Sequence, residues 1–271
     1  MLTIANDTTP PGLGEPLNLI LSADSDAAVL VHSASNGGFL NYMLSTNLGE
    51  ECLGQHLGAY QLANLGDGKG DVPQVQELRW NFGNPYVGTC QETLDGGLHL
   101  RYWIQNNTGA YFLASSIEKP ASEYHDIPPD GYNIGRDEIV GNLTGTYIPP
   151  RTVSSSSTFQ GTTSYANYTY QTSVQYVSGL LQNSSSALRV SHHPPKRHLM
   201  LTTHAVGVNH NQTVAVNGYP AIDGLVAVLT VKVTSSPKAT TTGRAPLSKE
   251  SSVGFLGSAL AIVLLSVFLL V

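Results

Sequence analysis

The longest hydrophobic segment of the chain is its C-terminal end. Residues 253–271 carry no charged side chain. As a helix they would span roughly 28 Å, close to the hydrocarbon core of a bilayer at about 30 Å. The pattern therefore predicts a hydrophobic helix that meets a membrane, either as a retained transmembrane span or as the cleaved signal for a glycosylphosphatidylinositol (GPI) anchor.

Alternation of apolar and polar residues predicts β-strands over much of the remaining chain. Residues 17–21 form a first apolar strand, and residues 98–104 place leucine and tyrosine side chains on an inner face. On the opposite face of that strand His99 and Arg101 are predicted to meet solvent, and residues 110–118 supply the partner strand. Enrichment in β-branched and aromatic residues predicts three further strands, at residues 168–176, 212–218 and 224–233.

Helical spacing is restricted to short segments. The apolar residues at 39–44 predict a short packed helix, which Gly49 is expected to close. A second helix is predicted at residues 133–141, and the glycine-dense segment 53–71 is predicted to form turns. The whole pattern predicts an α+β, β-dominated fold with antiparallel or mixed sheets, a few short helices and the C-terminal hydrophobic helix.

The same pattern divides the chain into four parts. Residues 1–13 are predicted to be a disordered N-terminus, and residues 14–233 a single globular domain that is long enough to bury a substantial core. Residues 234–252 are rich in Ser, Thr and Pro, which predicts an O-glycosylated stalk. The hydrophobic segment 253–271 follows it directly.

Composition excludes one class of partner and supports attached sugar. The net charge is −6, so no basic surface predicts nucleic-acid binding. Charged residues make up 12% of the chain against a usual value of about 25%, so solubility must come from neutral polar residues or from glycans. Six Asn-x-Ser/Thr sequons are candidate N-glycosylation sites: Asn6, Asn106, Asn142, Asn167, Asn183 and Asn211.

Cysteine and motif patterns predict a disulfide rather than a metal or cofactor site. Cys52 and Cys90 predict one disulfide if the domain is extracellular, or two buried thiols if it is cytosolic. No zinc-type Cys/His spacing, nucleotide-binding motif, metalloprotease motif or serine-hydrolase motif occurs, so no metal or cofactor is predicted. The glycine-rich segment from Asp67 to Asp71 fails the EF-hand calcium pattern, because Lys69 stands where an oxygen ligand is required.

The sequence leaves the orientation of the domain relative to the membrane open. Gly243, with Ala245 two residues later, has the small residues of a GPI attachment site. The N-terminus has no basic segment followed by an apolar run, so it is not a signal peptide. A tail-anchored protein with a cytosolic body would share this feature, and Lys238, Arg244 and Lys249 before the hydrophobic segment favour that alternative.

One polar group on a predicted loop is a candidate site. His125 and Asp126 lie near Asp130, and a histidine flanked by carboxylates can act as a general base or bind a metal. The alternative is structural: Asp130 begins a turn, and Arg136 or Asp137 pairs on the following helix.

His56 and His99 form a second candidate group. The predicted disulfide would bring their neighbourhoods together, where they could complete a site with His125. Exposed tyrosines and Trp103 could stack on sugar rings, although the alternation of the tyrosines favours packing within strands.

Five segments between Glu15 and Val233 are distinctive: LGQHLG, NLGDGKG, GTCQETLDGGLHLRYW, DGYNIGRD and GLVAVLTVKV. Together they resemble an uncharacterised family of secreted or cell-surface proteins of basidiomycete fungi. The resemblance implies an extracellular location and a shared fold, but no activity. Two features depart from it. The secretory signal expected before residue 15 is missing, which we attribute to a wrongly assigned start at Met1. Residues 188–205 have the composition of an insertion, which we attribute to a retained intron.

These observations predict a membrane-anchored fungal surface glycoprotein with an extracellular body and a structural or binding role. Its expected partners are the membrane and a cell-wall glycan. The alternative is an anchored or secreted hydrolase whose polar site lies near His56, His99, His125 and Asp126. Convergence of these histidines with a carboxylate in a concave pocket would favour the hydrolase.

Overall fold

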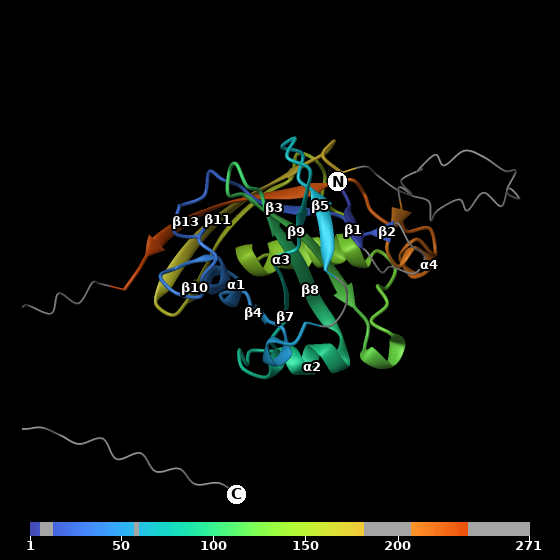
Figure 1. The fold of residues 1–271 in the computed structure, drawn as a ribbon, viewed down its shortest axis with the longest axis horizontal. Coiled ribbons are helices and arrows are strands. Elements are labelled where there is room, and N and C mark those ends of the chain that lie inside the picture. The colour runs from blue at the N-terminus through green and yellow to red at the C-terminus, as the bar shows by residue number, and fades with distance from the viewer. Residues whose placement is uncertain (6–12, 57–59, 182–206, 238–271) are drawn as a thin grey trace, which may run out of the picture. The chain divides into compact units, whose positions relative to one another are not determined.

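An eight-stranded mixed sheet organises the residues that the computed structural model describes, which are 1–5, 13–56, 60–181 and 207–237 (Figure 1). Its strands are β3 (Leu19–Leu21), β4 (Leu48–Glu50), β7 (Gln76–Trp80), β8 (Gly97–Ile104), β9 (Tyr111–Glu118), β10 (Thr158–Tyr165), β11 (Tyr168–Val177) and β13 (Val226–Ser235). Their order is β10-β11-β13-β3-β9-β8-β7-β4. Every neighbouring pair is antiparallel except β13 and β3, which run parallel.

Smaller elements complete the described part of the domain. A three-stranded sheet comprises β1 (Thr3–Ala5), β5 (Gln61–Asn64) and β6 (Asp71–Pro73), and β2 (Leu13–Gly14) pairs with β12 (Gly207–Val208). The helices are α1 (Phe39–Leu44), α2 (Gly88–Asp95), α3 (Gly131–Thr144) and α4 (Asn211–Val214), with 3₁₀ turns η1 (Cys52–Gly54) and η2 (Ala121–Glu123). Because β1 pairs with β5, the predicted disorder of residues 1–13 is wrong for residues 3–5.

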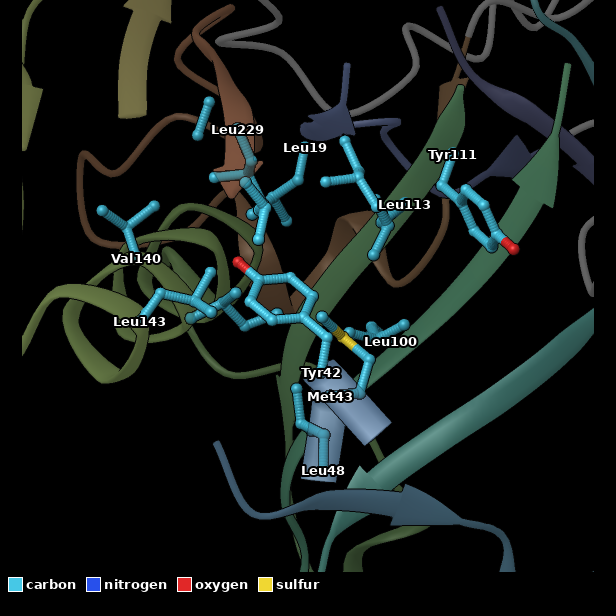
Figure 2. Close-up of a cluster of buried hydrophobic side chains, with 14 of the residues drawn as sticks. Leu19, Tyr42, Met43, Leu48, Leu100, Tyr111, Leu113, Val140, Leu143 and Leu229 are labelled. Carbon is cyan, nitrogen blue, oxygen red and sulfur yellow. The ribbon is translucent and has the colours of Figure 1, made fainter. Parts of the chain in front are cut away.

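Helix α3 contacts β8 and β9 in one half of the sheet and β10 and β11 in the other. Because β3 and β13 separate these two pairs in the strand order, the large sheet must curl around α3. Helices α1 and α3 pack on this inner face and bury the main hydrophobic core (Figure 2). Its side chains include Leu19, Leu100 and Leu229 from the sheet, and Tyr42 and Leu143 from the helices. Burial of each such side chain contributes about 1.5–3 kcal/mol, so this core is the main source of stability.

Two glycines let α3 approach the sheet closely on both sides. A β-carbon at Gly135 would lie 2.6 Å from backbone atoms of Ser116 in β9, and one at Gly161 in β10 would overlap the backbone of Thr144 in α3. Since protein interiors are close-packed, neither position has room for a larger side chain.

The outer face of β7, β8 and β9 is buried as well. Helix α2 contacts β7 and β8, and β6 of the small sheet contacts β8. As predicted, Leu98, Leu100 and Tyr102 face the inner core. His99 and Arg101, which were expected to meet solvent, are only 1% and 8% exposed. The prediction was wrong because α2 and the small sheet cover this face, and the alternation within a strand carries no information on what packs against it.

Most long periodic segments form the predicted elements, whereas short ones often do not. The strands predicted at 17–21, 98–104, 110–118, 168–176 and 224–233 and the helices predicted at 39–44 and 133–141 are present, with shifted ends. The strand predicted at 212–218 is wrong, because this segment contains α4, where the buried Val214 donates its backbone N–H to the carbonyl of His210. Gly49 lies within β4 rather than closing α1, and β5 and β6 replace part of the turns predicted at 53–71.

The predicted disulfide is present. It joins Cys52 in η1 to Cys90 in α2, with 4.5 Å between the two Cα atoms. The bridge closes a loop with a sequence separation of 38 residues, which stabilises the fold by about 4 kcal/mol in the chain-entropy model. It also fixes two of the elements near the outer face of the sheet to each other.

Several predictions concern residues outside the described ranges. These are the hydrophobic segment 253–271, the GPI site at Gly243, the insertion at 188–205 and the sequons at Asn6 and Asn183. Within the described ranges, no helix combines the length and hydrophobicity needed to cross a bilayer. Strand β13 continues to Ser235, two residues beyond the predicted end of the domain.

The close contact at Gly135 can be tested by enlarging the side chain. We expect Gly135→Ala to lower the free energy of unfolding by about 1–3 kcal/mol, because the added methyl group overlaps the backbone of Ser116. Glu138→Ala is the matched control on the same helix. Glu138 is exposed, so its replacement should change stability by less than about 0.5 kcal/mol. Equal urea-unfolding midpoints for the two variants would contradict this account.

Candidate functional site: a buried charged cluster

Ten ionisable side chains gather between the outer face of β7, β8 and β9 and the elements that cover it. We call this group the charged cluster; its members are Glu15, Glu51, His56, Glu77, Arg79, Glu92, His99, Arg101, Glu118 and His125. Strands β7, β8 and β9, helix α2 and three connecting segments contribute them. Most members are buried, and His125 is the most accessible, with 31% of its side chain exposed.

Arg79 is the centre of the charged cluster. Its guanidinium group contacts Glu77 on the same strand, Glu92 of α2 at 2.8 Å and Glu118 of β9 at 2.9 Å. A single cation therefore joins the sheet to the helix that covers it. Removal of one partner from a buried ion pair is strongly destabilising, because the remaining charge has neither water nor a counter-ion.

Arg101 connects the cluster to the small sheet. Its Nη1 lies 2.5 Å from Oε2 of Glu77, and its Nε lies 3.4 Å from Oε1 of Glu15. The amide of Gln61 in β5 donates to the same Glu15 oxygen at 3.1 Å, and the indole N–H of Trp103 donates to the Gln61 carbonyl at 3.1 Å. Because Trp103 is fully buried, the prediction that it could stack on a sugar ring is wrong.

Two of the predicted histidines meet at one carboxylate. His99 is buried in β8, with its Nδ1 hydrogen-bonded to the Ser116 hydroxyl at 2.8 Å and its Nε2 3.4 Å from Oε1 of Glu118. His125 follows η2, and its Nδ1 lies 3.3 Å from Oε2 of the same glutamate. Glu118 therefore bridges a buried and a partly exposed imidazole.

The third predicted histidine joins the cluster through Glu51. The Nδ1 of His56 lies 2.9 Å from Oε2 of Glu51, and the imidazole stacks on Tyr60 with 4.4 Å between ring centroids. One potential ligand atom from each of Glu51, His56 and Glu77 falls within 4.8 Å of the others. The structure thus places each of the three histidines beside a carboxylate, but His99 and His125 share Glu118 whereas His56 pairs with Glu51. The convergence of all three in one concave pocket, which the hydrolase hypothesis required, stays a prediction.

The other predicted polar residues are paired elsewhere. The carboxylate of Asp126 contacts Nδ1 of His210 at 3.1 Å. The fully buried Arg136 donates to both carboxylate oxygens of Asp223, at 2.7 and 2.9 Å, and to Oδ1 of Asp137 at 2.8 Å. These contacts fasten α3 to the segment before β13, so the structural alternative accounts for Arg136 and Asp137.

Acidic groups outnumber basic ones in the charged cluster. Its five carboxylates face two guanidinium groups, so three negative charges remain when every carboxyl group is ionised and the histidines are neutral. Burial raises the pKa of Glu77 to about 8 and that of Glu92 to about 7, against the attraction of the arginines. Near neutral pH the cluster can therefore take up a proton or a cation.

The pKa of Glu118 is shifted in the opposite direction. Burial alone would raise its pKa, but His99, His125 and Arg79 together outweigh that effect and lower it. In return, the neighbouring Glu118 carboxylate raises the pKa of His125. The cluster thus holds carboxyl groups of high and low proton affinity side by side, an arrangement that acid–base sites share with structural ion networks.

Sequence reasoning misses the residues at the centre of the cluster: Glu77, Arg79, Glu92 and Glu118. Glu77, Arg79 and Glu118 lie on strands, where a charged residue in an alternating pattern is ordinarily assigned to solvent. Glu92 lies on the helix α2, which the sequence pattern did not predict. One signal could have indicated burial. Trp103 lies on the same face of β8 as His99 and Arg101, and a large apolar ring on a supposedly polar face indicates that something covers it.

No protein-family model, curated protein or solved structure matches this chain. The resemblance to basidiomycete surface proteins therefore stays a prediction. The function is inferred from the fold, the charged cluster and the sequence.

The raised pKa of Glu92 predicts how the free energy of unfolding changes with pH. Because folding raises this pKa from 4.5 to about 7, the stabilisation from the protonated carboxyl is complete below about pH 4.5 and is lost as the pH rises through 7. Glu92→Gln keeps a neutral side chain and should remove this loss. Relative to the variant, the wild type should lose up to about 3 kcal/mol of unfolding free energy between about pH 5 and pH 8.

Glu118→Gln is the matched control with the opposite trend. Folding lowers the pKa of Glu118, so its stabilisation is present above the ordinary value of 4.5 and is lost as the pH falls below it. The difference in unfolding free energy between the wild type and this variant should therefore decrease as the pH is lowered. Urea titrations across the pH range measure both differences, and parallel curves for the two variants would refute the assignment.

Proposed function

We propose that this chain is a membrane-anchored surface glycoprotein with an extracellular domain of structural or binding character. The disulfide between Cys52 and Cys90 is the observation that carries the proposal, since disulfides persist in oxidising compartments and are rare in the cytosol. The hydrophobic segment 253–271 supplies the anchor in this proposal. Together they favour an extracellular body over the tail-anchored, cytosolic alternative.

The positions of the sequons support the same orientation. Asn106 is exposed in the turn between β8 and β9, and Asn167 is exposed in the turn between β10 and β11. Asn142 differs, because it lies on α3 and its side-chain nitrogen is buried. Since the glycan must attach to that nitrogen, we propose that Asn106 and Asn167 carry sugar and that Asn142 does not.

A cavity beside the end of α3 is the surface that best fits a glycan partner. It has a volume of about 600 Å³, and its lining includes Glu138, Asn142 and Tyr147. Tyr147 is 84% exposed, so its ring can contact a ligand, while the exposed carboxylate of Glu138 can accept hydrogen bonds from hydroxyl groups. This cavity takes the place of the buried Trp103 as the candidate glycan contact.

One observation favours the hydrolase as a second candidate: His56, His99 and His125 all lie beside carboxylates. Two features weigh against it. The cluster lies beneath α2 and the small sheet, and its carboxylates are largely engaged with arginines of the same cluster. A substrate would reach His125 first, since it is the most exposed member.

Glycosylation and anchoring can be tested on the protein from its native host. We expect peptide N-glycosidase to increase its electrophoretic mobility, and Asn106→Gln and Asn167→Gln each to remove one glycan. Asn142→Gln is the matched control and should leave the mobility unchanged. Phosphatidylinositol-specific phospholipase should release the protein if the anchor is a GPI group. An unshifted band together with two free thiols would overturn the extracellular orientation.

The hydrolase alternative has its own measurement. Purified protein should be assayed with chromogenic esters and glycosides, beside the Glu118→Gln and Asp24→Asn variants. If the alternative holds, Glu118→Gln should lower the turnover at least tenfold, because two histidines lose their shared carboxylate. Asp24→Asn, at an exposed position outside both the charged cluster and the cavity, should then retain full turnover. Turnover that is absent, or equal in both variants, supports the binding role instead.

A further inference from the structure

We propose that Glu51, His56 and Glu77 bind a divalent transition-metal ion such as Zn²⁺ or Mn²⁺. One ligand atom from each residue lies within 4.8 Å of the other two, so one ion can contact all three after small side-chain adjustments. An imidazole nitrogen with two carboxylate oxygens is a ligand set that suits these ions. Because the residues come from the β4–β5 connection and from β7, only the folded chain assembles them.

Burial and missing hydrogen bonds support this site. Glu77 is fully buried and Glu51 nearly so. The Nε2 of His56 is inaccessible and has no hydrogen-bond partner, whereas Oε2 of Glu77 is ion-paired with Arg101 at 2.5 Å. A buried nitrogen without a hydrogen bond is costly, and a bound ion would satisfy the His56 Nε2.

Neighbouring contacts hold each ligand in place. Glu51 precedes the disulfide-bonded Cys52, and the ring of Tyr60 stacks on the imidazole of His56. Arg79 and Arg101 both contact Glu77, one at each carboxylate oxygen. Outer groups of this kind orient the ligating side chains of metal sites, so the arginines act here as positioning residues.

The charge of the surroundings favours a cation. The charged cluster carries three more carboxylates than guanidinium groups, and its elements exclude water from most of it. A divalent ion would neutralise most of that excess. The competing arrangement is protonation of the carboxyl groups or of His99 and His125, and it requires no metal.

The test is a metal titration of the full-length chain in detergent, prepared without a polyhistidine tag and stripped with a chelator. We expect Zn²⁺ or Mn²⁺ to bind in calorimetry with one equivalent per chain and to raise the melting temperature. Glu51→Gln and His56→Asn should each weaken binding at least tenfold. His210→Asn, which alters a histidine outside the triad, should bind within twofold of the wild type.

Three outcomes would overturn the proposal. The first is a stripped wild type whose melting temperature does not respond to either ion. The second is binding by Glu51→Gln and His56→Asn that equals the wild type. The third is equal binding of Ca²⁺, which would indicate unspecific attraction to the acidic cluster. Because the wild-type titration alone can refute the site, a variant that fails to fold does not leave the question open.

Discussion

The triple ion pair of Arg79 is the interaction on which the architecture of the outer face depends. This guanidinium group joins Glu77, Glu92 and Glu118, and so connects two strands of the large sheet with the helix α2 above them. A sheet face lined with carboxylates would normally remain open to water, because charges lose several kcal/mol of solvation on burial. With the arginine in place, the same face can be covered. The cover then encloses His99 and Arg101 as well.

Because both faces of the sheet are covered, the charged residues between β7, β8, β9 and their cover have altered proton affinities. Five of its 19 acidic residues lie in the charged cluster, where their proton affinities diverge. Burial raises the pKa of Glu77 and Glu92, whereas the surrounding bases lower that of Glu118. Arrangements of this kind serve catalysis in some proteins and stability or ion binding in others. In this protein the cluster is buried and its carboxylates pair with arginines of the same cluster, which favours a role in stability or ion binding.

The proposed surface role and the proposed metal site are independent of each other. The first rests on the disulfide, the exposed sequons and the hydrophobic segment 253–271, and concerns where the domain is located. The second rests on the geometry of Glu51, His56 and Glu77. They share one element, because the disulfide that stabilises the domain also fixes the segment that carries Glu51. An ion bound there would further stabilise the cover on the outer face.

The sequence by itself determined the long strands, the helices α1 and α3, the cysteine pair and the hydrophobic C-terminal segment, because each depends on local periodicity or composition. Tertiary structure alone decided which faces are buried. His99 and Arg101 alternate like solvent-facing residues, and only the packing of α2 and β6 against β8 removes them from water. It also made residues 211–214 a short helix where a strand was predicted at 212–218, since packing of Val214 overrides a weak β-propensity. The charged cluster was out of reach because its members are up to about 110 positions apart, and single-chain periodicity carries no information on such contacts.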